Sequence, residues 1–574
     1  MSAARFSSPA IDQKADELLD GAVRWARLGA AAKAALLIRV KRSVYRKAEC
    51  WATTASVAKG IAGTPLSGEE WISGPWALLY ALNRYIATLQ EIARAGEPYI
   101  DSRRIRERPN GQVVVNVFPQ NLYDRLLLGG IRAEVWMQPD ITPLGLGATM
   151  ATWYRQSAQT PRVALVLGAG NISSIAPLDV LYKLVAGGAV CMLKLNPVNA
   201  YLGPVLEDAL APLVEDGFLR FAYGGAEIGK YLCNHDAIDE IHITGSAATH
   251  DAIVFGDGPD AAERKSRNEP VLNKPVTSEL GNVSPTIVVP GPWSNGDFRF
   301  QAENIVTQKM HNGGFNCIAS QVLVLPKDWN GTPKLREQID TVLEGLQDRP
   351  AFYPGASARA ARLIENRSAV RSYGTDTRGF VARTRFEADF ADASEPAFAT
   401  EAFGSVLAVT SIPGDIEAYL GKAVVFANES LSGTLGANII AHPATIQKFP
   451  RAIDEAIADL RYGCVAVNVW SGVWFFLCES TWGAFPGHPR NDIGSGTGVV
   501  HNSFLFSAPQ KSVVHGPFAP FPRSIMGYGA TLLPKPPWFV TNGMAQEIGR
   551  ALCDFEANKD PLAMARVAIA AMRA

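Results

Sequence analysis

A cysteine that follows two glycines is the first residue in this sequence that could do chemistry. Residues 312–320 read N-G-G-F-N-C-I-A-S, with Cys317 shortly after Gly313 and Gly314. A helix start beside Cys317 would lower the pKa of its thiol and make it a nucleophile. The small residues would leave space for a substrate. A buried, unreactive cysteine is the ordinary alternative.

Glu279 is a candidate base. It lies in residues 278–285, S-E-L-G-N-V-S-P, among small and apolar neighbours. A buried carboxyl has a raised pKa, which suits a general base near neutral pH. A solvated glutamate at the end of a strand is the alternative for any single glutamate.

A glycine-rich turn, G-A-G-N-I-S at residues 168–173, follows the apolar run 163–167. It resembles a dinucleotide-binding loop, whose usual partner is an acid about 20 residues further on. Here the next apolar run, 190–195, is followed by Asn196 and Pro197, and neither the run nor these two residues supply an acid. Taken alone, the turn therefore predicts the start of a helix, with a standard phosphate-binding loop as the alternative.

The run I-T-G-S at residues 243–246 also reads as a strand followed by a turn and a helix. Free amides at a helix start favour an anion such as a pyrophosphate. An ordinary N-cap at Ser246 is the alternative.

The elements around these motifs alternate between strands and helices. Short apolar runs at 163–167, 190–195, 219–222 and 240–243 predict strands, and helical patterns at 179–186, 206–213 and 227–233 separate them. Such alternation indicates a parallel sheet covered by helices. The charged stretch 256–274 predicts a surface loop, and a second α/β region runs from about 285 to 490.

The flanks differ from this middle part. Three-and-four-residue spacing of apolar residues predicts helices at 11–28, 31–58 and 71–95, and the tail closes with a helical stretch at 544–573. The β-rich runs 113–117 and 132–136 predict an arm that could pair with another subunit.

Composition excludes several classes of protein. The 574 residues include 54 Lys and Arg against 55 Asp and Glu, so the net charge of −1 argues against binding to nucleic acid or an anionic membrane. Seven scattered cysteines without a C-x-x-C pair argue against disulfides and a zinc site. Without an apolar signal region near Met1, we expect a cytoplasmic protein that binds no metal.

Taken in their order along the chain, 168–173, 243–246, 278–285 and 312–320, the four motifs resemble the aldehyde dehydrogenase superfamily. Residues 401–406, E-A-F-G-S-V, are similar to its E-x-F-G-P motif, and residues 428–433 are similar to its N-x-x-x-x-G-L segment. Residues 482–487 look loosely like its P-F-G-G turn. The resemblance covers about residues 160–500.

The resemblance implies a role for each motif. Cys317 would attack an aldehyde carbonyl, Asn171 would donate its side-chain amide to the oxyanion, and Glu279 would activate the water that hydrolyses a thioester. NAD or NADP would be the cofactor. The residues that the resemblance assigns to it are Lys194, Gly225, Gly245, Ser246, Glu401 and Phe403. Pro197 stands where the family often has a glutamate for the adenosine ribose, which leaves NADP open.

The segment near the family's substrate entrance is rich in aromatic residues. It supplies the predicted substrate pocket of Asn468, Trp470, Trp474 and Phe475, which would suit a hydrophobic aldehyde. A core strand or a subunit interface explains the same composition equally well.

The predicted fold class is α/β and aldehyde dehydrogenase-like, with a Rossmann-type cofactor domain, an α/β catalytic domain and a β-hairpin oligomerisation arm. The predicted parts are 1–110 with 160–284 for the cofactor, 111–159 for the arm, 285–499 for catalysis and 500–574 as a C-terminal extension. The resemblance implies a homodimer or tetramer.

Two alternative functions stay open. An acyl-CoA reductase or CoA-acylating aldehyde dehydrogenase would share the Gly170-Asn171 turn, but such relatives usually lack the glutamate base. A catalytically silent binding protein could keep the same fold.

Overall fold

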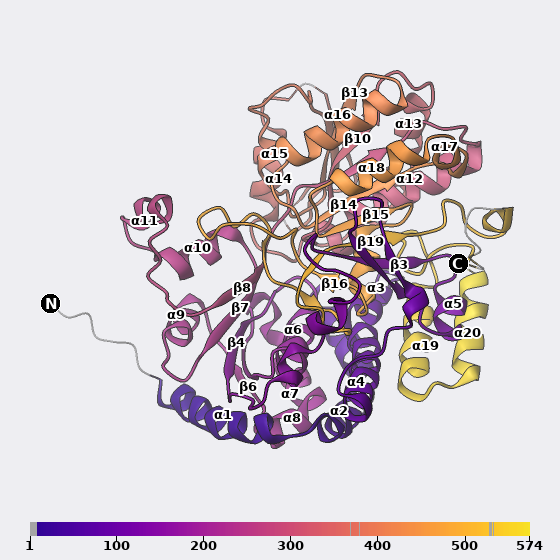
Figure 1. The fold of residues 1–574 in the computed structure, drawn as a ribbon. Coiled ribbons are helices and arrows are strands. Elements are labelled where there is room, and N and C mark those ends of the chain that lie inside the picture. Colours follow the sequence, from indigo (N-terminus) through magenta and orange to yellow (C-terminus); the bar gives the residue numbers. More distant parts are fainter. Residues whose placement is uncertain (1–7, 368, 378, 527–530, 532, 574) are drawn as a thin grey trace.

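The computed structural model describes residues 8–367, 369–377, 379–526, 531 and 533–573. A six-stranded sheet forms one half of it (Figure 1). In spatial order its strands are β17 (Gly496–Thr497), β8 (Val276–Glu279), β7 (Glu240–Thr244), β4 (Val163–Leu167), β5 (Val190–Lys194) and β6 (Leu219–Ala222). The five strands β8 to β6 are parallel, and β17 is antiparallel to β8. The predicted alternation of strands and helices is confirmed.

Helices pack around this sheet. They are α6 (Ile175–Val185), α7 (Gly203–Ala209), α8 (Ala211–Glu215), α9 (Ala226–Cys233) and α10 (Ala247–Phe255). The stretch 256–274, predicted as a loop, contains the further helix α11 (Ala261–Arg267). That prediction is wrong in part, because the charges that indicated a loop form i,i+4 ion pairs, Arg264 with Asp260 and Arg267 with Glu263, that support a helix.

An eleven-stranded sheet forms the other half. In spatial order its strands are β1 (Ile105–Glu107), β2 (Val113–Phe118), β3 (Arg132–Met137), β19 (Pro509–His515), β15 (Cys464–Val467), β14 (Gly436–Ile440), β9 (Ser284–Val288), β10 (Ser320–Pro326), β13 (Val406–Ile412), β12 (Arg383–Glu387) and β11 (Val370–Tyr373). Its helices are α12 (Asn295–Met310), α13 (Thr332–Gly345), α14 (Ala356–Ile364), α15 (Pro396–Ala399), α16 (Ile416–Glu429), α17 (Pro443–Lys448) and α18 (Pro450–Asp459).

The predicted arm joins this sheet within a single chain. Strands β2 and β3 pair antiparallel, β3 pairs with β19 on its other edge, and β19 pairs with β15. Both edges of β3 are therefore taken by strands of the same chain. The part after residue 500 is also more than an extension, because β19 lies in the interior of the sheet.

Helices from both ends of the chain pack together. The N-terminal helices are α1 (Pro9–Arg27), α2 (Ala30–Ala58), α3 (Ser67–Trp71) and α4 (Ala77–Ala95), and the C-terminal helices are α19 (Ala545–Asn558) and α20 (Pro561–Met572). Helix α19 contacts α3, α2 and α4, and Figure 1 shows α19 and α20 beside α4. The predicted helix 71–95 is interrupted by a π-helical turn around Pro75, which lacks a backbone N–H.

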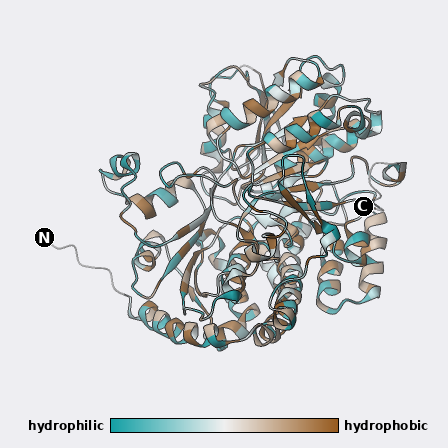
Figure 2. Cartoon of the chain, viewed as in Figure 1, coloured by the Kyte–Doolittle hydropathy of each residue, from teal (hydrophilic) through white to brown (hydrophobic). Residues whose placement is uncertain are grey.

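Apolar side chains concentrate in the interior. Figure 2 shows hydrophobic residues on the strands and hydrophilic residues on the outer faces of the helices. All residues of β4 and β5 are buried, as expected for parallel strands covered on both faces. Within the part of the chain that the structure describes, we find no helix that combines the length and apolar character of a membrane span.

Candidate active site

One cavity brings together the predicted catalytic and cofactor residues. It has a volume of about 920 Å³ and lies at the carboxyl ends of β4, β5, β7 and β8, where open parallel sheets bind ligands. The predicted residues that line it are Asn171, Lys194, Gly225, Gly245, Ser246, Glu279, Cys317, Glu401 and Phe403. Residues up to 232 positions apart thus share one site.

Cys317 lies in a turn between a short 3-10 helix, His311–Gly314, and strand β10. No helix begins at the thiol, so the predicted lowering of its pKa by a helix start is wrong. The two glycines before it are required by the local backbone conformation. Gly313 and Gly314 have φ of 70° and 80°, and a Cβ on Gly314 would lie 2.3 Å from the carbonyl oxygen of Gly404. They allow close packing against the Glu401 loop.

The surroundings of Cys317 favour the protonated form of its thiol. Burial, and then the neighbouring carboxylate of Glu279, raise the pKa of the thiol well above its ordinary value. A thiol of this kind attacks a carbonyl only when a base accepts its proton. Glu279 is placed to be that base.

Glu279 is held at the end of β8 by strands on both sides. Its carbonyl accepts a hydrogen bond from Gly245 of the β7 turn, and β17 pairs with it on the other edge. The side chain is 3% exposed, and its Oε2 accepts a hydrogen bond of 2.7 Å from the indole Nε1 of Trp482. Burial raises the pKa of Glu279 to about 7. Its carboxyl therefore exchanges protons near neutral pH, as a general base must.

Asn171 lies in the turn between β4 and α6 and reaches the Cys317 loop. Its side-chain Nδ2 donates to the carbonyl oxygen of Phe315 at 2.9 Å. An amide nitrogen carries two hydrogens, so one remains for a second acceptor. The turn predicted as a possible phosphate loop thus supplies a donor beside the thiol.

A buried ion pair between Lys59 and Glu70 holds the backbone segments that carry Asn171 and Asn312. The Nζ of Lys59 donates to Oε1 of Glu70 at 2.6 Å, to the carbonyl oxygen of Asn171 at 3.0 Å and to Oδ1 of Asn312 at 3.0 Å. The side chains of Lys59 and Glu70 are 1% and 0% exposed. All three ammonium hydrogens have acceptors, and the pair ties the N-terminal helices to both catalytic segments.

We expect Lys59→Met to lower the free energy of unfolding by about 3–5 kcal/mol, because it leaves the Glu70 carboxylate buried without a partner. Urea denaturation would measure the change. Lys47→Met is the matched control, since Lys47 pairs with Asp208 at the same distance of 2.6 Å on the surface. We expect its effect to stay below about 1 kcal/mol. Equal effects of the two substitutions would contradict this prediction.

Glu401 and Phe403 form another wall of the cavity. A Cβ on Gly281 would lie 2.2 Å from Oε2 of Glu401, so only a glycine allows the carboxyl to lie there. Burial raises the pKa of Glu401 to about 8, and the nearby ammonium of Lys309 lowers it in part. The guanidinium of Arg359 donates to the carbonyl oxygens of Ala402 and Phe403 and so holds this loop.

The other end of the cavity fits a dinucleotide. Gly225 and Ser246 are the residues before helices α9 and α10, whose first amides carry partial positive charge. Ser246 is also an N-cap, since its Oγ accepts from the N–H of Thr249. A Cβ on Gly225 would enter open space, and Oε1 of Glu401 is buried without a hydrogen-bond partner among the described residues. A pyrophosphate and a ribose hydroxyl would satisfy these groups.

The predicted substrate residues lie elsewhere. Trp470, Trp474 and Phe475 are buried in the hydrophobic core, and none of them lines the 920 Å³ cavity. Trp470 contacts the backbone next to Cys317, because its Nε1 donates to the carbonyl oxygen of Ile318. Asn468 accepts from the N–H of Ala441 and lines two smaller cavities instead. The aromatic composition that suggested a pocket describes packed core at three of these positions.

Several supporting residues were not identified from the sequence. They are Lys59, Lys309, Arg359 and, as a partner of Glu279, Trp482. The two lysines and the arginine are of common types without a local motif, and Trp482 stood out only as the first residue of the turn 482–487. Each of the four acts through a residue distant in the chain. A buried lysine such as Lys59 carries no signal in the pattern of its helix.

The chain matches known proteins over its middle part. Residues 171–474 match the sequence profile described as "Aldehyde dehydrogenase family". The chain is 26% identical over 347 residues to 1-pyrroline-5-carboxylate dehydrogenase of Geobacillus thermodenitrificans, which covers 57% of this chain and 60% of that protein. It is 26% identical over 220 residues to coniferyl aldehyde dehydrogenase of a Pseudomonas species, covering 38% and 40%. The chain thus spans about 60% or less of these curated relatives.

The fold extends the match to almost the whole chain. The crystal structure of NADP-dependent glyceraldehyde-3-phosphate dehydrogenase from Bacillus halodurans, complexed with NADP, aligns with a TM-score of 0.59. The alignment covers 88% of this chain and 91% of that one, at 18% identity. At this identity the likeness concerns the fold.

Proposed function

This chain belongs to the aldehyde dehydrogenase family, and we propose that it oxidises an aldehyde to a carboxylic acid with NAD or NADP. The observation that carries the proposal is the single cavity shared by Cys317, Glu279 and Asn171 with the predicted cofactor residues. A thiol, a base whose pKa is about 7 and an amide donor together suit attack on a carbonyl and hydrolysis of a thioester.

In the first half of the proposed reaction, the sulfur of Cys317 forms a bond to the aldehyde carbon. The thiol proton passes to Glu279, and the second amide hydrogen of Asn171 stabilises the oxyanion. Such a donor lowers the activation barrier by about 3 kcal/mol. The nicotinamide of NAD or NADP, when bound, supplies the acceptor for the hydride that leaves the carbon. Cys317 then carries the acyl group as a thioester.

In the second half, Glu279 releases its proton to solvent and takes one from a water molecule. The resulting hydroxide attacks the thioester carbon, the bond between sulfur and carbon breaks, and Glu279 passes the proton to the leaving sulfur. The products are the carboxylic acid and the free thiol of Cys317. The same carboxyl thus serves both halves, which requires a pKa close to the working pH.

Four groups would hold the cofactor. The amides of α9 and α10 would bind the pyrophosphate, Glu401 would accept from the nicotinamide ribose, and Lys194 would lie at the adenosine ribose. Position 197, three residues after the end of β5, is a proline rather than a carboxylate, so no acid at that position repels a 2′-phosphate. This supports the use of NADP as well as NAD. Soluble homo-oligomers of cytoplasmic location remain predictions.

We expect the purified protein to reduce NAD or NADP in the presence of a medium-chain or aromatic aldehyde, because the site holds a nucleophile, a base and a cofactor cavity together. The absorbance of reduced nicotinamide measures turnover, with each cofactor in turn. Free CoA in parallel reactions distinguishes a CoA-acylating enzyme, which would require it and release acyl-CoA. Cofactor binding without turnover on any aldehyde would favour a silent binding protein and contradict the proposal.

A further inference from the structure

The hydrogen bond between Trp482 and Glu279 joins two distant parts of the chain. The indole Nε1 of Trp482 lies 2.7 Å from Oε2 of Glu279, and the two side chains are 2% and 3% exposed. A hydrogen bond from a neutral donor to a carboxylate is stronger than one between neutral groups, and burial strengthens it further.

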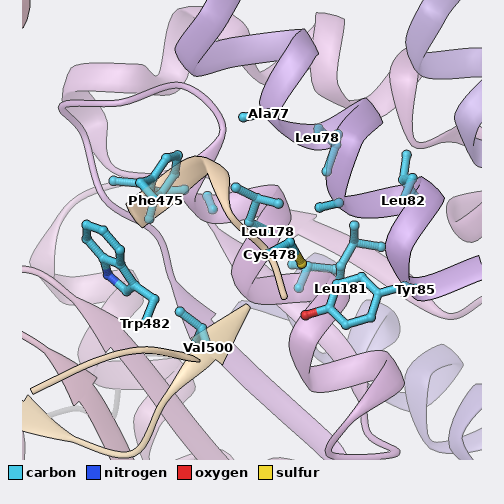
Figure 3. Packing of buried hydrophobic residues seen from close by; sticks show 14 of the residues in the cluster. Ala77, Leu78, Leu82, Tyr85, Leu178, Leu181, Phe475, Cys478, Trp482 and Val500 are labelled. Atoms are coloured by element: carbon cyan, nitrogen blue, oxygen red, sulfur yellow. The ribbon is translucent and has the colours of Figure 1, made fainter. Parts of the chain in front are cut away.

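Aromatic neighbours fix the indole ring. Trp474 stacks on it with a centroid distance of 4.1 Å and an interplanar angle of 28°, and His501 stacks at 5.9 Å and 24°. Phe475 contacts it edge-on at 5.2 Å, and Figure 3 shows Phe475 and Trp482 in the same packed layer. The packing therefore holds the ring in the orientation that directs its N–H toward Glu279.

The backbone of Trp482 is fixed as well. The two-residue strand β16 (Thr481–Trp482) pairs antiparallel with β18 (Val500–His501), which places Trp482 opposite Val500. The hydroxyl of Tyr85 in α4 donates to the carbonyl oxygen of His501 and holds this pair against the N-terminal helices. The donor thus belongs to a rigid layer.

The carboxylate has one oxygen engaged and one free. Oε2 accepts from the indole, whereas Oε1 is buried and accepts no hydrogen bond from the described residues. The charged or titratable groups that face Glu279 are Cys317, Asp179 and Glu401. Of these, Cys317 alone carries a proton that the proposed reaction must move.

We propose that Trp482 is a positioning residue that locks Glu279 by one oxygen and keeps the other free for the proton of Cys317 and then of water. This inference deepens the proposed function and rests on it for the role of Glu279. The indole acts through the carboxylate and touches no reacting atom. It also favours the charged form of the base, since its N–H can bond only to an acceptor.

The test compares Trp482→Phe with Trp474→Phe. Both substitutions remove an indole N–H from the same buried stack, but the N–H of Trp474 donates to the carbonyl oxygen of Thr481. The readout is the rate at which iodoacetamide alkylates Cys317, measured against pH without any substrate. Because this readout needs no turnover, it separates a failure of the inference from a failure of the proposed function.

We expect the acidic limb of the alkylation profile to move upward by about one pH unit in Trp482→Phe. The sign follows from the lost donor: without it the pKa of Glu279 rises, so the pair of Glu279 and Cys317 loses its first proton at a higher pH. We expect aldehyde oxidation near neutral pH to fall about tenfold. In Trp474→Phe we expect the limb to stay in place, because phenylalanine keeps an aromatic ring against Trp482 and the N–H that it removes does not bond to Glu279. Equal shifts in both variants, or none in either, would overturn the inference.

A measurement on the unsubstituted protein covers the case in which Trp482→Phe does not fold. In protein with ¹⁵N-labelled tryptophan, one indole N–H resonance should titrate with a midpoint near pH 7, as the carboxyl that it contacts changes charge. The same resonance should stop titrating in Glu279→Gln. If no indole resonance behaves in this way, Trp482 does not hold the base.

Discussion

Cys317→Ala is expected to reduce aldehyde oxidation by at least about 10⁴-fold while the protein still binds its cofactor. The substitution removes the atom that forms the bond to the substrate carbon, and the remaining groups cannot replace it. Glu279 and Asn171 would still line the cavity, so the loss would be chemical rather than structural. Nicotinamide reduction in steady state, together with cofactor binding by fluorescence, measures both parts.

Cys553→Ala is the matched control for the thiol. Cys553 is buried in α19 and does not line the cavity. We expect this variant to keep its activity. Unimpaired turnover by Cys317→Ala would refute the covalent mechanism through this thiol.

Glu279→Gln is expected to slow turnover by about 10²–10⁴-fold, because the proposed mechanism uses its carboxyl in both halves of the reaction. Glutamine keeps the shape of the side chain but can take a proton neither from the thiol of Cys317 nor from water. Stopped-flow absorbance should therefore show that reduced nicotinamide forms slowly from the first turnover. A rapid burst of reduced nicotinamide, with an acyl group on Cys317 in mass spectrometry, would contradict the role of Glu279 in the first half.

The pH dependence of the unsubstituted enzyme has a defined sign. Burial raises the pKa of Glu279 to about 7, and the base acts only when it is deprotonated. Steady-state turnover should therefore rise with pH through about 7. Glu479 is a second carboxyl that could titrate in this range, because burial raises its pKa to about 7 as well. It forms an ion pair with Arg84 outside the cavity, so Glu479→Gln should keep the acidic limb, and Glu279→Gln should remove it.

The C-terminal part of the chain is built into the larger sheet and the helical layer. Residues 500–574 were predicted as an extension, but β19 lies between β3 and β15. Helix α19 packs on α3, whose residue Glu70 is the partner of Lys59 behind the catalytic turn. The N- and C-terminal segments, which carry no recognised motif, thus pack against the residues that hold the Asn171 and Asn312 backbone segments.

The sequence by itself determined the local chemistry and most of the local elements. Residue types around Cys317 and Glu279 suggested a nucleophile and a base, and the resemblance of the motifs to the aldehyde dehydrogenase superfamily supplied the roles proposed for these residues, Asn171 and Glu401. Strands such as β4 and β6 have the predicted bounds, because a short buried run of apolar residues is a local property of the chain. Predictions of this kind need only neighbouring residues.

The tertiary structure alone decided which residues meet. Trp482 contacts Glu279 across 203 positions, and Lys59 contacts Asn312 across 253. No periodic pattern encodes such pairs, because they depend on how two sheets and the terminal helices pack. For the same reason, the aromatic run around Trp474 could be a pocket or a core, and its burial assigns it to the core. Composition describes what a segment can contact, and packing decides what it does contact.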